Sequence, residues 1–389
     1  MGSALSAFTT FWNTTGPNIM SGRDKFLNEA LLQTYVLSMF LRGREANEIL
    51  RGGQVIRDYV VFDDVSTAED YQVNDPWTYN LNQSGRMVSQ NWRFKRDYAA
   101  VNEIELALQN GGSDADRFQV FKDRRNIEMQ RMHTSIINKH EADLWANPAS
   151  DQAQMEAESG KKTMSIPAFI NEETYGLPTG WTTVQGENPT TNSKWRPALQ
   201  RYDYADILDA GSDFGGIFDA FDALSDDITF EAPPDPVPLG QEGVTSKQEC
   251  FIVTSDKGRR LFMKALRNSN QILLGDRQDP RYNKPRYDGW KIINVKTLNQ
   301  ATLYPASAGQ ASEDGATTTA GGTITNTGPR FYFINPKALT YFFHKDGYFK
   351  KMDSLKHPNN PETMIFPMRC WGNLFCRSRR RLGMVAPGA

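Results

Sequence analysis

The middle of the chain, residues 113–147, reads SDADRFQVFKDRRNIEMQRMHTSIINKHEADLWAN and contains no Gly or Pro. Ser113 and Asp116 form an S-x-x-D start signal, because a side-chain oxygen can cap a free N–H and an early acid faces the positive end of the helix. Pro148 follows directly, and proline cannot continue a helix. The sequence therefore predicts one helix of about 50 Å, at about 1.5 Å per residue.

One face of this predicted helix is apolar. Its members are Phe118, Phe121, Met129, Met132, Ile136 and Leu144, and Arg125 and His140 fill two gaps in the stripe. The remaining positions are mostly charged or polar. This pattern indicates a long helix that packs against sheets on one side and presents charge on the other.

Composition limits the class of protein. The 389 residues are enough for two or three domains. The 44 basic and 46 acidic residues nearly balance, so no global field favours nucleic acid. The mean hydropathy is −0.58, and the apolar run from Ala30 to Leu41 is interrupted and too short to cross a bilayer. We expect no membrane association and, since no basic region precedes an apolar run at the N-terminus, no signal peptide.

Three cysteines, Cys250, Cys370 and Cys376, give an odd count without paired metal-ligand spacing. An odd number cannot pair completely within one chain. Free thiols in a reducing compartment are the simplest interpretation.

The first hundred residues predict parts that a monomer could not use. Residues 1–20 read as an extended arm anchored by Phe8, Phe11 and Trp12, and a helix from Ser21 to about Leu50 follows. Residues 54–100 read as two strands, VIRDYVVFDDV and RMVSQNWRFKRDYAAV, around a polar and aromatic tip. A hairpin this long is not stable alone in water, so we expect it to lie on another subunit.

Three aromatic residues of this hairpin, Trp77, Tyr79 and Trp92, are candidates for buried anchors at such a contact. The alternative is that they form stacking platforms for sugars or bases. The sequence favours the anchors.

From residue 149 onward the chain alternates loops with short elements. Five runs read as strands: SIPAFIN, CFIVTS, GWKIINVKTL, RFYFINPKAL and MIFPMRCWGNLFCRSRRRLGMV. One run, DKGRRLFMKALRNSNQ, reads as a helix. Ile217, Phe218, Phe221 and Leu224 have the spacing of another helical face. Residues 306–328 form a Gly-, Ala-, Ser- and Thr-rich insert, which we expect to be an exposed loop. Helices and strands are segregated, which indicates an α+β protein.

Motifs for catalysis are missing. The sequence has no phosphate-binding G-x-x-x-x-G-K-[ST], no G-x-G-x-x-G after a strand and no G-x-S-x-G elbow. His133 and His140 are seven residues apart, whereas a zinc-protease helix pairs histidines four apart, so an interface or surface role is favoured. We therefore expect no catalytic residue, no cofactor, no metal and no enzyme activity.

Two charged segments leave alternatives open. Residues 203–235 carry ten acids, among them Asp219 and Asp222, but lack the spacing of a calcium loop; a solvated or inter-subunit face is favoured over cation binding. Near the C-terminus, the cluster Arg377, Arg379, Arg380 and Arg381 could contact phosphate. Ion pairs with acids of the same or a neighbouring chain are favoured for it.

Taken in order, these elements resemble the major capsid protein of tailed bacteriophages, the HK97-like fold. NPTTNSKWRP is similar to the segment that enters that family's axial domain, and CFIVTSDKGRRLFMKAL and YDGWKIINVKTL resemble elements of that domain. FYFINPKALTYFF, GYFKKMD and the final RRRLG tail resemble the family's ending. The resemblance implies an N-terminal arm (1–52), an extended loop (53–100), a peripheral domain (101–195) with spine helix 113–147, an axial domain (196–335) and a return to the peripheral domain (336–389).

The resemblance also implies a function. Such a protein self-assembles into hexamers and pentamers of an icosahedral shell around double-stranded DNA, in the virion, after assembly in the host bacterial cytoplasm. Separate scaffolding, portal and cement or decoration proteins are its expected partners. Expected subunit contacts are Phe8, Phe11, Trp12, Trp77, Tyr79, Trp92, Asp219, Asp222, Arg379, Arg380 and Arg381. Some family members cross-link a lysine of the extended loop; the one lysine in 53–100 is Lys95, near the hairpin base, so no such bond is expected.

Three rival functions stay open from the sequence. A DNA-binding protein would use the arginine cluster and show salt-sensitive affinity. A hydrolase would use paired carboxylates from 203–235. Another phage ring or tube protein would share the assembly but not the long helix and hairpin.

Overall fold

A computed structural model describes residues 49–50, 52–61, 85–102, 114–203, 216–228, 250–269, 286–287, 290–295, 298, 328–336 and 338–387. The predicted arm, the helix predicted from Ser21 up to residue 48, the hairpin tip and the insert predicted at 306–328, up to residue 327, lie outside these residues. The chain divides into two compact units. The first contains the described residues between 94 and 139 and between 346 and 371, and the second contains the other described residues.

The long helix is confirmed. Helix α4 extends over Asp114–Leu144. Four side chains spaced four residues apart along α4 are buried, as the apolar stripe predicted: Met132, Ile136, His140 and Leu144. Pro148 is the first residue of the next helix, α5 (Pro148–Met155), so the chain breaks where the proline predicted.

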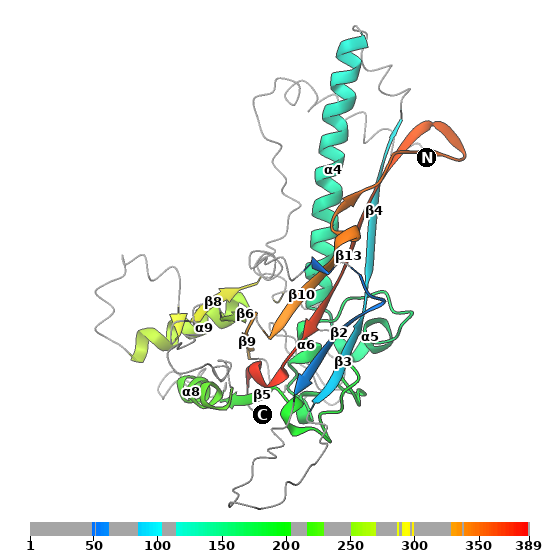
Figure 1. The fold of residues 1–389 in the computed structure, drawn as a ribbon. Helices are drawn as coiled ribbons and strands as arrows, with labels where there is room; N and C mark the ends of the chain where they lie inside the picture. The colour runs from blue at the N-terminus through cyan, green and yellow to red at the C-terminus, as the bar shows by residue number, and fades with distance from the viewer. Residues whose placement is uncertain are drawn as a thin grey trace, which may run out of the picture. The chain divides into compact units, whose positions relative to one another are not determined.

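The first unit is built on a long antiparallel strand pair that lies beside α4 (Figure 1). Strand β4 (Phe94–Asn102) pairs with β13 (Asn360–Cys376) from Asn102 opposite Thr363 to Phe94 opposite Trp371. Two short strands, β11 (Lys350–Lys351) and β12 (Leu355–His357), also pair with β13. The 3-10 turn η8 (Lys345–Gly347) precedes them.

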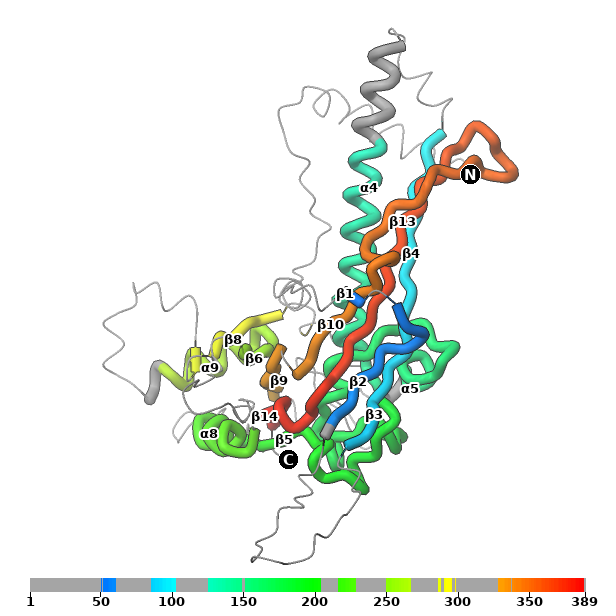
Figure 2. Tube along the Cα trace, viewed as in Figure 1, coloured from blue at the N-terminus to red at the C-terminus, as the bar shows by residue number. Residues whose placement is uncertain are grey.

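The second unit contains the predicted hairpin. β2 (Val55–Val61) and β3 (Gly85–Asn91) pair antiparallel along their full lengths and lie side by side in Figure 2. The sequence predicted that the second strand continues through residue 100. The structure corrects this: the strand ends at Asn91, and after Trp92 and Arg93 the chain continues as β4, whose partner is β13 instead of β2.

A further correction concerns the end of the helix predicted to about Leu50. Ile49–Leu50 form strand β1, which pairs in parallel with Phe343 and His344 of β10 (Leu339–His344). β10 in turn pairs antiparallel with the last residues of β13. Edge pairing with an existing strand outweighs the local helical pattern here.

A six-stranded sheet forms the main core of the second unit. Its order is β5-β14-β9-β6-β8-β7. The strands are β5 (Ala198–Tyr202), β14 (Gly383–Pro387), β9 (Phe331–Ile334), β6 (Phe251–Thr254), β8 (Trp290–Asn294) and β7 (Arg286–Tyr287). The predicted strands in CFIVTS, GWKIINVKTL and RFYFINPKAL are therefore confirmed. The last strand, β14, lies between β5 and β9, strands far earlier in the sequence.

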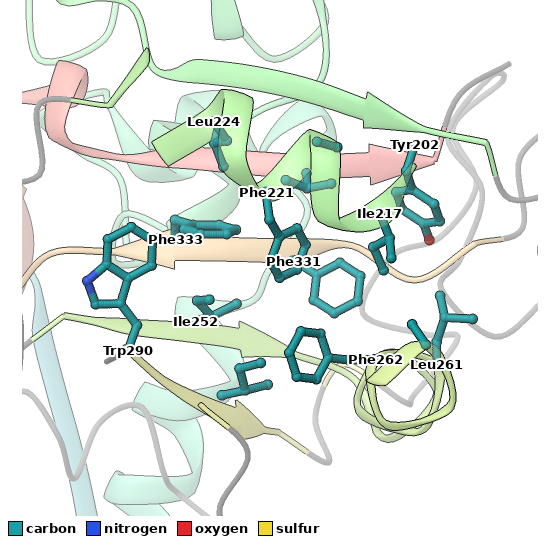
Figure 3. Packing of buried hydrophobic residues seen from close by; sticks show 14 of the residues in the cluster. Tyr202, Ile217, Phe221, Leu224, Ile252, Leu261, Phe262, Trp290, Phe331 and Phe333 are labelled. Carbon is teal, nitrogen blue, oxygen red and sulfur yellow. The ribbon is translucent and has the colours of Figure 1, made fainter. Parts of the chain in front are cut away.

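Two helices pack on this sheet, and both were predicted. α8 (Ile217–Asp227) packs on β5 and β14, and α9 (Asp256–Ser269) packs on β6 and β8. Figure 3 shows their aromatic side chains meeting over the strands. Phe221 stacks on Phe262 with ring centroids 5.8 Å apart, and it contacts Phe331 and Phe333 edge-on.

The segment between α5 and β5 contains one wrong prediction. SIPAFIN was expected as a strand, but Ile166–Phe169 form the short helix α6, with all four residues buried. Pro167 lies in its first turn, where a proline needs no N–H partner. Two 3-10 turns follow, η2 (Thr174–Gly176) and η3 (Ser193–Trp195). Together these elements confirm an α+β fold.

Candidate assembly surfaces

The two faces of the β4–β13 pair differ sharply. On one face, Ala99, Val101, Phe366 and Met368 are buried. Helix α4 contacts this side: Arg125 lies 5.1 Å from the centre of the Phe366 ring. Because side chains alternate along a strand, their neighbours point away from the helix.

That other face is exposed and aromatic. Phe94 is 63% exposed and Tyr98 is 64% exposed. Phe94 packs edge-on against Trp371 at 5.4 Å, and Tyr98 stands opposite Pro367. Leu355 of β12, which pairs with Ile365, is 57% exposed on the adjoining strand. We call Phe94, Tyr98, Leu355, Ile365, Pro367 and Trp371 the aromatic sheet face; contiguous apolar groups of this kind mark interaction surfaces.

Positive charge accompanies the aromatic sheet face. Arg96 stands directly opposite Arg369, and like charges in that position repel. Arg369 is held in place: its guanidinium lies 4.4 Å from the Trp371 ring centre and donates to the Asp346 carbonyl. A partner with acidic or acceptor groups would relieve the repulsion.

The β2–β3 hairpin presents a second exposed apolar pair. Tyr59 and Met87 are directly opposite each other, 58% and 61% exposed. The reverse face is buried: Ile56, Val88 and Trp92 belong to a core cluster with Trp195, Phe342 and Phe375. The hairpin thus buries one face in the core cluster, while Tyr59 and Met87 stay exposed on the other.

Polar contacts hold this hairpin to its own unit. Arg86 pairs with Glu187 at 3.1 Å, and Arg377 pairs with Asp58 at 2.9 Å. Gln90 and Asn91 donate to the carbonyls of Met155 and Glu156, residues at the end of α5 and just after it. Exposed ion pairs contribute little, so most of the attachment comes from the buried face.

The structure places Trp92 inside its own chain. It is 6% exposed, its Nε1 donates to the Gly53 carbonyl at 2.9 Å, and its ring meets His344 edge-on. Trp92 therefore anchors the hairpin base within the subunit. Phe8, Phe11, Trp12, Trp77 and Tyr79 lie outside the described residues.

The arginine cluster is divided by burial. Arg379 is completely buried and donates to the carbonyls of Phe169, Trp195 and Gly176. Burial lowers its pKa to about 10. It therefore ties three segments of its own chain together and has no accessible surface for a neighbour or for phosphate.

The other three arginines differ from Arg379. Arg377 forms the ion pair with Asp58, as favoured from the sequence. Arg380 is exposed, and Arg381 is half-buried with a pKa lowered by burial. Arg380 and Arg381 stay predicted contact residues.

Sequence reasoning missed a similar interior arginine, Arg93. Its guanidinium donates to four carbonyls, those of Met155, Ala157, Glu158 and Lys162, and burial lowers its pKa. These bonds fix the loop after α5. The sequence offers no local signal for this role, because the break between β3 and β4 that places Arg93 in the interior depends on the remote strand β13.

The acids of α8 face outward. Asp219 and Asp222 are exposed, and Asp222 accepts a hydrogen bond from the Tyr287 hydroxyl. Asp227 accepts from the Gln200 amide. Most other acids of 203–235 lie outside the described residues.

The titratable groups inside the fold have structural partners. The Tyr341 hydroxyl and His140 Nδ1 are 2.6 Å apart in the interior, and Arg330 pairs with Glu172 at 2.8 Å. In the described part of the chain, no group of three or more His, Cys, Asp or Glu side chains is arranged to hold a metal ion. No helix within the described ranges is long and apolar enough to cross a membrane.

All three cysteines are buried, and none forms a disulfide, which agrees with the predicted thiols. Burial raises the pKa of Cys370 to about 11 and that of Cys376 to about 12. Lys95 is also buried, and its Nζ donates to the Lys139 carbonyl at 3.2 Å. A lysine in this position is poorly placed for a bond to a neighbour.

No protein-family model matches the sequence, and no curated protein matches it either. Solved structures do match the fold. The chain resembles the Cyanophage A-1(L) capsid asymmetric unit with a TM-score of 0.54 and 11% identity, covering 94% of this chain and 95% of that one. It also resembles the capsid of a native GTA particle, with a TM-score of 0.51 and 10% identity over 94% and 93% of the two chains.

These likenesses extend over almost the whole length of each chain. They define the class of the fold, a phage capsid fold of the α+β type. More particularly, the long helix, the hairpin and the two sheets make up the HK97-like fold predicted from the sequence.

Proposed function

We propose that the chain is the major capsid protein of a tailed phage, which self-assembles into the icosahedral shell around double-stranded DNA. The observation that carries this proposal is the HK97-like fold over 94% of the chain, shared with proteins described as capsid subunits. The exposed aromatic sheet face adds a physical reason: a monomer gains nothing by keeping these side chains in water.

In the shell, hexamers and pentamers of the chain supply the cover that the aromatic sheet face lacks. The segment between β2 and β3, residues 62–84, suits this role. It carries five acids, Asp63, Asp64, Glu69, Asp70 and Asp75, and no Lys or Arg. The aromatic sheet face carries Arg96 and Arg369. The acidic and aromatic segment 62–84 of a neighbouring copy therefore complements the aromatic sheet face, because its acids match the arginines and its aromatic residues match the exposed rings.

The role is structural rather than catalytic, and its site of action is the virion. The domain division predicted from the sequence is part of the proposal, with one refinement: the sheet that contains residues 198–202 and 251–254 also contains β14, so 383–387 belong to the axial domain. Scaffolding, portal and cement proteins remain expected partners.

The DNA-binding alternative is less well supported. It depended on the arginine cluster, and Arg379 is unavailable because it is buried against three carbonyls. Cluster affinity for phosphate would need several accessible charges side by side.

Expression of the chain alone, followed by size-exclusion chromatography and negative-stain electron microscopy, tests the proposal. Rings, shells or shell fragments are expected. A chain that stays monomeric, also when co-expressed with the neighbouring structural proteins of its genome, would contradict it. Tight, salt-sensitive binding of the monomer to DNA would favour the alternative instead.

A further inference from the structure

Helix α8 carries an acidic stripe. Asp219, Asp222 and Asp226 are all exposed, and their spacing of three and four residues places them on one side over two turns. The opposite side, with Ile217, Phe221 and Leu224, is fixed in the core. The stripe therefore points away from the sheet, and α8 contains no Lys or Arg that would offset it.

Helix α9, on the same sheet, carries a basic stripe. Lys257, Arg260 and Lys264 repeat the spacing of three and four residues, with Arg260 and Lys264 exposed and Lys257 half-buried. Phe262 and Ala265 fix the other side of this helix in the core. The two stripes thus have equal spacing and opposite charge, and each is about 10 Å long at about 1.5 Å per residue.

Both stripes are unfavourable in a single subunit. Like charges three or four residues apart on a helix repel. Asp226 also lies at the negative C-terminal end of α8, the wrong end for its charge, whereas the first turn of α9 contains Asp256 beside its basic residues. Within the described residues, no ion pair joins Asp219, Asp226, Arg260 or Lys264 to an opposite charge.

From this complementarity we infer that the acidic stripe of α8 in one copy of the chain docks on the basic stripe of α9 in the next copy. The inference rests on the proposed function and specifies one of its subunit contacts. A contact between two α8 stripes would bring like charges together, so a symmetric dimer through these helices is disfavoured. Pairing of α8 with α9 is head-to-tail: each copy keeps one stripe for a third copy, and such contacts form a ring when the rotation between copies closes.

Charge reversal on one stripe tests the contact. Asp219→Lys with Asp226→Lys makes both stripes basic, and Arg260→Glu with Lys264→Glu makes both acidic. Either variant is expected to lower the yield of rings and shells about tenfold in low salt, because attraction becomes repulsion. The four changes combined in one chain restore opposite signs and should recover assembly. The readouts are sedimentation and negative-stain electron microscopy.

A control matched to the variant Asp219→Lys with Asp226→Lys changes the net charge equally elsewhere. Glu158→Lys with Glu173→Lys adds the same charge at two exposed loop positions outside both helices, and it should assemble like the unmodified chain. Circular dichroism and thermal unfolding show that each variant folds.

Assembly of both one-stripe variants at the unmodified level would overturn this contact and leave the proposed function intact. Failure of the folded four-residue variant to recover would overturn it as well. If neither the unmodified chain nor the control forms any oligomer, also on co-expression with the neighbouring structural proteins of its genome, the proposed function fails together with the contact.

Discussion

The two sheets use aromatic side chains in opposite ways. In the six-stranded sheet, Phe331 and Phe333 point into a core that α8 and α9 close, and both are fully buried. In the β4–β13 pair, Phe94 and Tyr98 point away from the covering helix and are almost two-thirds exposed. Helices cover one face of each sheet. The exposure of Phe94 and Tyr98 therefore does not result from the lack of a helical layer.

Charge follows the same division. On the six-stranded sheet, acids and bases lie on the outer sides of the helices, away from the strands. On the β4–β13 pair, Arg96 and Arg369 face each other among the aromatic residues. A region complete within one chain keeps its apolar groups inside, whereas this mixture of exposed aromatics and arginines is typical of an interface before its partner binds.

The largest expected effect is on the closed core. Phe221→Ala removes a ring that contacts Phe262, Phe331 and Phe333, and it should lower the free energy of unfolding by about 3–5 kcal/mol. Urea unfolding followed by circular dichroism measures this. Phe218→Ala, at a half-buried position of the same helix, should cost clearly less. Equal, small costs for both variants would mean that the core is not centred on Phe221.

Arg379 tests whether the C-terminal cluster belongs to the interior or to a surface. Arg379→Ala leaves three buried carbonyls without their donor and should cost about 3 kcal/mol of unfolding free energy. Arg380→Ala, one residue further along at an exposed position, should change it by less than about 0.5 kcal/mol. A stable Arg379→Ala variant with reduced DNA affinity would contradict the interior role.

The aromatic sheet face should respond in the opposite sense to the core. Phe94→Thr with Tyr98→Thr keeps strand propensity and should change the unfolding free energy of the unassembled chain by less than about 1 kcal/mol. The same variant should form far fewer rings or shells, since its contact surface is lost. Chromatography beside urea unfolding separates the two effects. Full assembly of this variant would show that the aromatic sheet face does not take part in a subunit contact.

The smallest effect concerns His133, whose ring lies 4.5 Å from the Phe349 ring in the first unit. Partial burial, and secondarily the charge of Lys351, lower the His133 pKa in the folded chain. The unfolded chain therefore binds the proton first, so the His133 contribution to stability is complete above about pH 6.5 and declines as the pH falls through the folded pKa.

His133→Gln removes this dependence. The unmodified chain should lose slightly more stability than the variant when the pH is lowered from 8 to 5, as urea midpoints at both values would show. An equal or larger loss in the variant would rule out the proton-linked contribution of His133.

Much of the fold could be predicted from local pattern. The cap, stripe and stop around residues 113–147 predicted α4, the strand-like run VIRDYVVFDDV predicted β2, and period-two alternation from Met87 predicted β3. The break after Asn91 could not be predicted, because alternation continues through Trp92 and Arg93. Only the remote partner β13, from the end of the chain, decides that Phe94 begins a new strand.

The surfaces were harder to predict than the elements. A run of arginines usually indicates a solvated or interface segment, and nothing local shows that Phe169, Gly176 and Trp195 offer carbonyls to Arg379. Trp92 was expected at a subunit contact for the same reason: a large aromatic residue on a strand suits a core and an interface equally. Phe94 and Tyr98 were not singled out, since exposure depends on which side α4 covers.

A cryo-electron microscopy map of particles assembled from the unmodified chain tests the capsid role most directly. We expect rings within a closed shell, in which a second copy of the chain covers Phe94, Tyr98 and Trp371. Particles in which these three side chains face solvent would contradict it, and so would a chain that forms no particles under any of the assembly conditions above.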